Sequence, residues 1–428
     1  MLVSALLCTL LAGCGQKEQT PSSDGSSSGE SVELNLYYWD ESFNDAMAQI
    51  VADFESTHEN IKINLTTIPW GEYWTKLQTA LPTDSGPDIF WCNYMYSLEF
   101  IPNNLMLPVD TTNVDTSQYV AEALDMLSSD GKLYAVPFML DSVAMVYNKD
   151  MFDAKGIAYP TADWTWEDLR ATAAALTDDS TYGYCLDFQS QMGTFNFLLQ
   201  NGVTVYEEDG LTPNFNSDAA KEAFNFQYDL VFTDKSSPNA AQLSELSKGD
   251  RFMAGQVAMT YCTSPYVATY YDALGDALGC VELPAGKEEA CTLNAVGFAG
   301  SANTAHPEEV QQFLEYASTV QCQNMIAQSG MPACLDAAQT WVANFPEDVN
   351  AAAFINMLDV AHRLPLSVKS PAATRSAYES ECGNIFSGNK TVEQGLNDAV
   401  AAVEAELEQL KTVKRKEVAE KIKVARGY

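Results

Sequence analysis

The chain has 428 residues, well beyond the roughly 250 to 300 at which a single hydrophobic core stops growing, so two lobes are expected. Hydrophobic residues make up 46% of the sequence, as in a soluble globular protein, and the formal charge is −35, from 58 acidic and 23 basic residues. Because this charge would repel phosphates, it excludes nucleic acid as a partner. It does not indicate a cationic ligand, since an acidic surface also serves solubility.

The N-terminus has the pattern of an exported, lipid-anchored protein. Residues 1–12 are apolar but too short to span a bilayer, and they lead into Leu11-Ala12-Gly13-Cys14, which resembles the lipobox of bacterial lipoproteins. The resemblance implies a signal peptide over 1–14 and a lipid on Cys14. Residues 15–31 are polar and rich in Gly and Ser, which predicts a flexible linker. We therefore expect a body tethered at the outer face of the bacterial cell membrane.

The first lobe is predicted to begin with a β-α-β unit. A strand starts at Val32, a helix follows over 42–55, and a second strand covers 61–65. One stripe of the helix carries its apolar residues: Phe43, Met47, Ile50, Val51 and Phe54. A unit of this length requires a right-handed crossover and a parallel sheet.

Ligands of open parallel sheets bind beyond the carboxyl ends of the strands. Trp39, Asp40 and Glu41 follow the first strand and are therefore candidate ligand-binding residues. The alternative interpretation is a helix N-cap and a packed aromatic ring.

Aromatic residues concentrate in the next segment, where a helix is predicted over 70–81 and a turn at Gly86-Pro87 leads into a strand. A pyranose ring presents an apolar C–H face that stacks on an aromatic ring, and carboxylates and amides bind its hydroxyls. We expect Trp74 to pack in the core. The candidate ligand residues here are Trp70, Trp91, Asn93 and Tyr94.

The segment from Gly131 to Phe152 is predicted to cross between the lobes. Its apolar run exceeds the usual length of a strand and contains Pro137, which cannot donate to a sheet. We therefore expect two strands joined across 137–141, each serving a different sheet. Asp141, an isolated acid in this run, would then lie where the lobes meet around a ligand.

At this point the sequence resembles a known family. GKLYAVPF followed by AMVYNKDMF is similar to the hinge-crossing segment of the extracellular solute-binding proteins of bacterial ABC importers, the sugar-binding family that includes maltose-binding protein. GPDIFW, TWEDL and FMAGQVAM resemble further segments of that family, in the same order. The resemblance implies an α/β fold of the two-lobed periplasmic-binding-protein type (type II), with a mixed sheet flanked by helices in each lobe and three hinge crossings.

The second lobe is predicted from about Val143. Thr165 caps a helix, a strand covers 182–188, and a helix covers 195–199. FMAGQVAM predicts a helix, a glycine turn and a strand, whose exit carries Tyr266. The resemblance places a stacking aromatic residue at Tyr266.

The second and third crossings are predicted at 281–284 and 330–333. Lobe 1 would then comprise 32–140 and 285–329, and lobe 2 would comprise 141–284 and 330–428. A further family aromatic corresponds to Arg375 here, which argues against a maltose-like ligand. The last residues form a basic helical tail that either is solvated or meets lipid or the importer.

Neither a cofactor nor a metal site is predicted. The three histidines are scattered, no C-x-x-C pair occurs, and no G-x-S-x-G, P-loop or G-x-G-x-x-G motif is present. Apart from Cys8 and Cys14, eight cysteines remain, as disulfides or as buried thiols. Two pairs are near in sequence: Cys280 with Cys291, and Cys322 with Cys334.

The sequence thus predicts a monomeric, non-enzymatic substrate-binding lipoprotein that captures a sugar or oligosaccharide between its lobes and delivers it to the permease subunits of an ABC importer. Two alternatives stay open. A secreted glycoside hydrolase or lyase could use Asp40, Glu41 and Asp141 as paired carboxylates, because acids that bind sugar hydroxyls look the same in sequence as acids that cleave glycosidic bonds. A surface adhesion lipoprotein would need no hinge.

Overall fold

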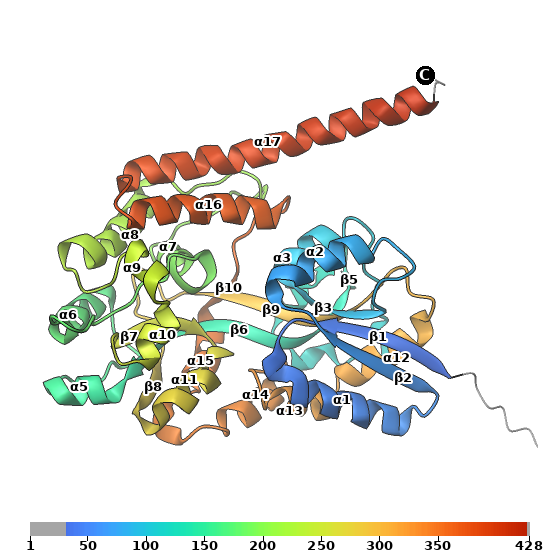
Figure 1. The fold of residues 1–428 in the computed structure, drawn as a ribbon, viewed down its shortest axis with the longest axis horizontal. Helices are drawn as coiled ribbons and strands as arrows, with labels where there is room; N and C mark the ends of the chain where they lie inside the picture. The colour runs from blue at the N-terminus through green and yellow to red at the C-terminus, as the bar shows by residue number, and fades with distance from the viewer. Residues whose placement is uncertain (1–30, 426–428) are drawn as a thin grey trace, which may run out of the picture.

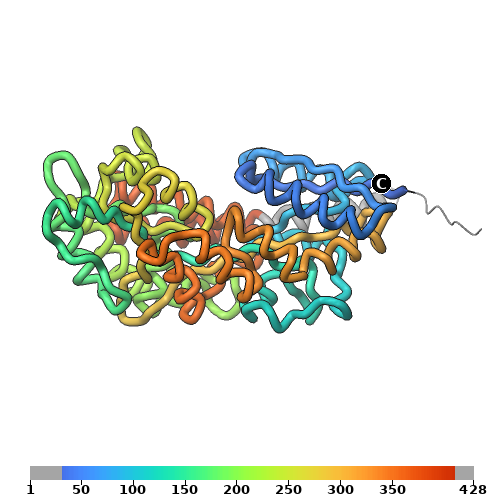
Figure 2. The backbone as a smooth tube through the Cα atoms, turned by 90° about the horizontal axis from the view of Figure 1, so that it is seen from below, coloured from blue at the N-terminus to red at the C-terminus, as the bar shows by residue number. Residues whose placement is uncertain are grey.

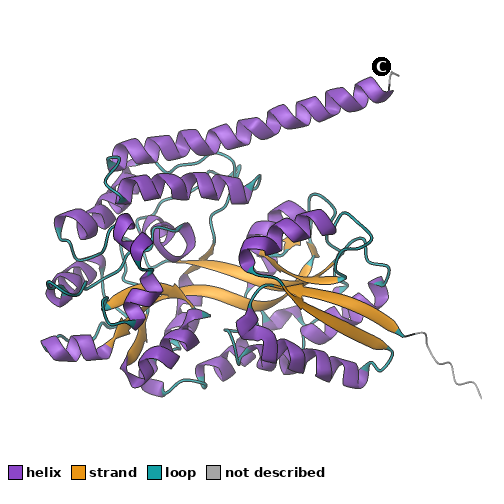
Figure 3. Cartoon of the chain, viewed as in Figure 1, coloured by secondary structure: helices purple, strands orange, loops and turns teal. Residues whose placement is uncertain are grey.

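Two lobes joined by long strands make up the protein (Figure 1). The computed structural model describes the backbone of residues 31–425 and the side chains as far as residue 409. The expected signal peptide, its Cys14 and nearly all of the linker lie outside the described residues, as do the side chains of the basic tail. Strands run through the middle of both lobes and helices cover them on either side (Figure 3).

The first lobe is built on a parallel β-α-β unit, as predicted. β1 (Val32–Tyr38) lies between β2 (Ile61–Thr67) and β3 (Ile89–Asn93) and pairs in parallel with both. The predicted apolar stripe of the first helix is buried against this sheet. The helices of this lobe are α1 (Asn44–Thr57), α2 (Trp70–Ala80), α3 (Tyr94–Phe100), α4 (Ala121–Met126), α12 (Pro307–Ala317) and α13 (Val320–Ile326). A small hairpin joins β4 (Ser128–Ser129) to β5 (Lys132–Leu133).

The second lobe is richer in helices. Its strands are β7 (Met259–Thr263) and β8 (Leu278–Val281), and β10 (Ala361–Arg363) lies beside it. Its helices are α5 (Lys149–Lys155), α6 (Trp166–Leu176), α7 (Phe195–Gln200), α8 (Asp218–Tyr228), α9 (Ala240–Glu245), α10 (Lys248–Met253), α11 (Tyr266–Leu274), α15 (Ala353–Asn356), α16 (Pro371–Phe386) and α17 (Val392–Ala425). α14 (Leu335–Val342) lies between the lobes at the lower edge of Figure 1. The predicted cap of α6 is present as a full capping box between Thr165 and Asp168.

The first crossing is a single strand, so the prediction of two strands was wrong. β6 (Ala135–Asn148) is 14 residues long and continues through Pro137, where a bulge shifts its register against β9 (Cys291–Gly300). The bulge accommodates the missing N–H of the proline. The first half of β6 pairs with β9, and the second half pairs with β7 and β8. The strand can be this long because its neighbours change along its length.

The second crossing is made by β9, so the prediction of Val281–Pro284 was also wrong. The Trp164 indole donates a hydrogen bond to the Glu282 carbonyl (2.8 Å), and Ala285 pairs with Thr165, so this segment stays in the second lobe. β9 then runs antiparallel to both β6 and β3. In the third crossing, Gly330–Ala333 lies along β6, where Leu140 donates its N–H to the Met331 carbonyl. Figure 2 shows from below how these segments join the two lobes.

Two further expectations are decided by the structure. The segment 182–188 forms isolated bridges at Tyr182 and Cys185 rather than the predicted strand. Its backbone is also bound elsewhere, since Tyr184 donates to the carbonyl of Ser236. The eight cysteines of the body are buried free thiols, and neither of the two pairs near in sequence is bonded.

Candidate functional site

A cavity of about 790 Å³ lies between the two lobes, at the carboxyl ends of β1 and β3. Its walls come from both lobes and from the crossing strands. Seven predicted residues line it: Trp39, Asp40, Trp70, Asn93, Asp141, Tyr266 and Arg375. Of the two other cavities, the one of about 780 Å³ has tyrosines but no tryptophan, and the one of about 900 Å³ has no aromatic residue among the described residues that line it. We therefore take the cavity of about 790 Å³, called the cleft below, as the candidate ligand site.

The first-lobe wall of the cleft is a cluster of aromatic rings centred on Trp39. The Trp39 ring centroid lies 5.3 Å from that of Trp70, 5.3 Å from that of Trp74 and 5.1 Å from that of Trp91. Trp70 is 48% exposed, whereas Trp74 and Trp91 are buried. The buried rings hold Trp39 and Trp70 in place, so the exposed faces form a rigid platform.

Three predicted ligand residues are not at the cleft. Trp91 is wholly buried between the Phe43 and Phe138 rings, because β3 lies inside the sheet, paired with β9. Tyr94 begins α3 and lines a different cavity, near Arg363. Glu41 is exposed to solvent in a helical turn and is not among the cleft-lining residues. All three predictions failed for the same reason: a position at or after the end of a strand does not decide which way the side chain points.

Asp40 and Asn93 combine a capping contact with a place in the cleft. Asp40 Oδ1 accepts hydrogen bonds from the N–H (2.9 Å) and hydroxyl (2.7 Å) of Ser42. Asn93 Oδ1 accepts the Tyr96 N–H at the start of α3 (3.1 Å). Each cap uses only the Oδ1 atom and fixes the side chain. The second carboxylate oxygen of Asp40 and the amide nitrogen of Asn93 can therefore bind a ligand.

The crossing strands place Asp141 directly opposite Asn294. The Asn294 amide donates to Asp141 Oδ2 (3.0 Å), since a carboxylate can only accept. The second carboxylate oxygen of Asp141, Oδ1, and the amide oxygen of Asn294, Oδ1, are both buried without a partner in the protein. Desolvation raises the pKa of Asp141 to about 6, with a lowering contribution from Asn294 and a further rise from the charge of Asp40. Both residues line the cleft, so two acceptors without a partner in the protein lie at its wall.

The second-lobe wall carries Tyr266 and Arg375. Tyr266 begins α11 directly beyond β7 and is 44% exposed. Arg375 lies on α16, where its Nε donates to Glu379 Oε1 (2.9 Å). Glu379 Oε1 also accepts hydrogen bonds from the N–H (2.9 Å) and hydroxyl (2.7 Å) of Ser190, which ties α16 to a neighbouring turn.

That turn was missed by the sequence analysis. The chain from Ser190 to Thr194 forms a π-helical turn, and its neighbourhood brings Gln189, Gln191 and Met192 to the cleft. The run FQSQMG, polar between two apolar segments and ending in glycine, was the available signal. Asn294, Glu379 and Trp74 also line the cleft and were not among the predicted ligand residues.

Chemically, the cleft can stack an apolar ring face and bind several hydroxyl groups at once. Exposed rings come from both lobes, and carboxylate and amide groups lie on the crossing strands and the turn.

Within residues 31–409, no group of three or more His, Cys, Asp or Glu side chains is arranged to hold a metal ion. Every helix of the described part is too short or too polar to cross a lipid bilayer.

Comparison with known proteins gives consistent results. The family model for bacterial extracellular solute-binding proteins matches residues 40–323. An uncharacterized ABC transporter extracellular-binding protein of Pyrococcus horikoshii is 24% identical over 95% of this chain and 96% of its own. The maltodextrin-binding protein MdxE of Bacillus subtilis is 21% identical over 96% of this chain and 97% of its own.

Among solved structures, an ABC substrate-binding protein of Listeria monocytogenes in complex with cycloalternan has the same fold. It superposes with a TM-score of 0.81 at 24% identity, covering 89% of this chain and 100% of its own. The maltose-binding protein MalE of the same organism, in complex with maltose, superposes with a TM-score of 0.72 at 19% identity, covering 88% of this chain and 98% of its own. These likenesses establish the two-lobed type II fold.

Proposed function

Because this chain belongs to the bacterial extracellular solute-binding protein family, we propose that it captures a sugar or oligosaccharide between its lobes and delivers it to the permease of an ABC importer. The observation that carries the proposal is the composition of the cleft. It joins an aromatic platform at Trp39 and Trp70 to the unpaired acceptors of Asp141 and Asn294.

Each part of the cleft suits one part of a sugar. The exposed ring of Trp70 offers a face for the C–H side of a pyranose, and Tyr266 offers a second face from the other lobe. The free Oδ1 atoms of Asp141 and Asn294 accept hydrogen bonds from ligand hydroxyls. A ligand held by both lobes stabilises the closed arrangement, and the transporter distinguishes closed from open by the relative position of the lobe surfaces.

The protein acts as a receptor, without chemical turnover. The relatives whose printed names state a ligand bind oligosaccharides, among them maltodextrin and arabinooligosaccharides. Isothermal titration calorimetry against maltotetraose, cycloalternan, arabinotriose and a galacto-oligosaccharide tests the proposal. We expect saturable binding to at least one of them, with the sugar recovered intact by chromatography after long incubation.

Three outcomes separate the candidate functions. Binding without shortened products supports the receptor. Accumulation of shortened products, abolished in Asp141→Asn, would replace the proposal with a glycoside hydrolase. If neither binding nor turnover occurs with any carbohydrate of a broad glycan array, the carbohydrate assignment is wrong.

The receptor works as a monomer at the outer face of the bacterial cell membrane, tethered by a lipid on Cys14. The sequence Leu11-Ala12-Gly13-Cys14 and the polar linker after it support this placement. Expression in a Gram-positive host followed by fractionation tests it, with Cys14→Ala as the control. Wild type should partition with membranes and the variant should be released, whereas equal partition of the two would disprove the anchor.

A further inference from the structure

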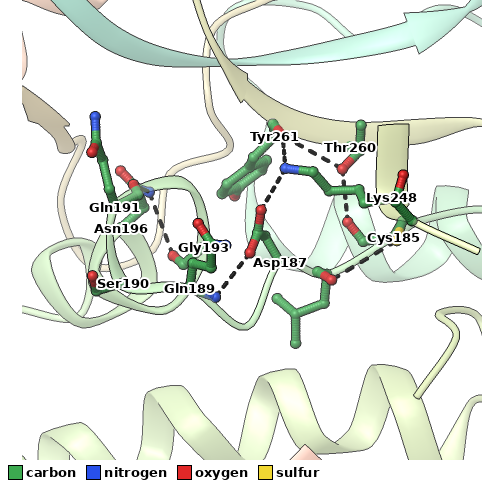
Figure 4. Close-up of polar contacts among 12 residues, drawn as sticks. Cys185, Asp187, Gln189, Ser190, Gln191, Gly193, Asn196, Lys248, Thr260 and Tyr261 are labelled. Carbon is green, nitrogen blue, oxygen red and sulfur yellow. Dashed lines mark hydrogen bonds and ion pairs between the residues drawn. The ribbon is translucent and has the colours of Figure 1, made fainter. Parts of the chain in front are cut away.

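A buried ion pair lies behind the ligand-facing turn of the second lobe (Figure 4). Lys248 Nζ donates to Asp187 Oδ2 at 2.6 Å, and the two side chains are only 13% and 11% exposed. The same ammonium group donates to the carbonyl of Tyr261 in β7 (2.8 Å). Neither charged residue is among those lining the cleft, so a contribution to binding has to act through other groups.

Asp187 contacts the turn directly. The second carboxylate oxygen of Asp187, Oδ1, accepts the N–H of Gln189 (2.8 Å), the first residue of the turn at the cleft. Gly193 passes so close to Asp187 that a Cβ atom at position 193 would lie 1.8 Å from the Asp187 carbonyl oxygen. The turn therefore wraps tightly around Asp187, and Lys248 ties that residue to β7.

The far side of the turn is held separately. The Gln191 carbonyl accepts hydrogen bonds from the Asn196 amide (2.8 Å) and from the Thr292 hydroxyl of β9 (2.7 Å). Ser190 donates to Glu379, as described above. These contacts fix the backbone, while Gln189, Gln191 and Met192 keep their side chains at the cleft.

A buried ion pair is a poor source of stability, because desolvation of two charges cancels most of their attraction, and apolar residues of similar volume often serve as well. Its place directly behind a ligand-facing turn therefore calls for another role. We propose that Asp187 and Lys248 are positioning residues. They hold residues 189–192, the part of the turn at the cleft, in the arrangement that receives the ligand. The ligand part of this inference rests on the proposed function, whereas the effect on the turn does not.

The test replaces the pair by apolar residues, Asp187→Leu together with Lys248→Met. Asp187→Asn alone is less suitable, since it leaves the Lys248 charge buried without its partner. We expect the double variant to unfold at nearly the wild-type temperature. Hydrogen–deuterium exchange of the amides in 188–194 should accelerate by at least about tenfold in the ligand-free protein. The Kd for whichever of the four saccharides binds wild type most tightly should rise on the order of tenfold.

A control with the same pattern of contacts, although its carboxylate is exposed, exists in the same lobe. Lys149 Nζ also donates to one carboxylate, Asp348 (2.9 Å), and one carbonyl, Asp276 (3.0 Å), but lies outside the cleft. Lys149→Met with Asp348→Leu should leave both exchange at 188–194 and the Kd unchanged.

Two results would overturn the inference: wild-type exchange and Kd in the Asp187→Leu, Lys248→Met protein, or equal effects in the control. If no saccharide binds wild type, the proposed function is at fault, and the exchange comparison alone decides whether the pair positions the turn.

Discussion

Replacing Asp141 by asparagine should make the protein more stable at neutral pH and a poorer receptor. In the native cleft, Asp141 Oδ1 and Asn294 Oδ1 are both acceptors without a donor. An asparagine at 141 can accept from the Asn294 amide and return a hydrogen bond to Asn294 Oδ1, because the two residues lie directly opposite each other on β6 and β9. The substitution thus replaces the unpaired Asp141 oxygen by a donor for Asn294 Oδ1, and it removes a desolvated charge.

The pKa of Asp141 sets the magnitude. Desolvation raises it from 3.8 to about 6, and each pKa unit corresponds to 1.36 kcal/mol, so the ionised carboxylate destabilises the folded state by at most about 3 kcal/mol. Since Asp141 is partly exposed to the cleft, we expect a gain of about 1 to 2 kcal/mol in the free energy of unfolding. The folded-state pKa is the higher one, so the penalty is full above about pH 6 and fades as the pH falls toward 3.8.

Thermal unfolding at pH 7.5 and pH 4.0 measures this difference. The variant should melt a few degrees above wild type at pH 7.5, with most of the advantage lost at pH 4.0. Glu41→Gln, which removes one carboxylate outside the cleft, should show neither effect. Calorimetry should find saccharide binding weakened by at least about tenfold in Asp141→Asn, since an acceptor for the ligand is lost. An Asp141→Asn protein that is no more stable than wild type at pH 7.5 would refute the reasoning.

Three other predictions follow from burial and exposure. Trp91→Ala should lower the free energy of unfolding by about 3 to 5 kcal/mol, because it empties a fully buried site; weakened saccharide binding at unchanged unfolding temperature would contradict our placement of this ring. Tyr266→Ala should weaken binding by several-fold to some tens-fold and reduce the ligand-induced contraction seen by small-angle scattering below saturation; wild-type binding and contraction would show that the second-lobe wall lies elsewhere. The eight body cysteines should react with a thiol reagent only after unfolding, because burial keeps them from the reagent and desolvation raises the pKa of those such as Cys92 and Cys280; rapid labelling of any of these eight thiols in the native protein, located by peptide mapping, would refute this.

The sequence by itself determined the elements and their order. The apolar stripe of α1, the capping box of α6 and the glycine turn before β7 are local features, since each depends on residues a few positions apart. The segment 131–152 was recognisable as a crossing because a long apolar run with one acid fits no single sheet. Together with the family resemblance, these signals predicted two α/β lobes, three crossings and a cleft near Trp39, Asp141 and Tyr266.

Only the tertiary structure decided which side chains reach the cleft. Trp91 follows the same pattern as Trp39, yet its ring is buried because β9, some 200 residues later in the chain, pairs with β3. Asn294 becomes the partner of Asp141 through the register of two strands that are distant in sequence. The backbone of the turn at 189–192 is bound by Thr292 and Glu379, which come from two elements distant in sequence. Direction and partnership of side chains arise from contacts between distant segments, and no local pattern in the chain encodes them.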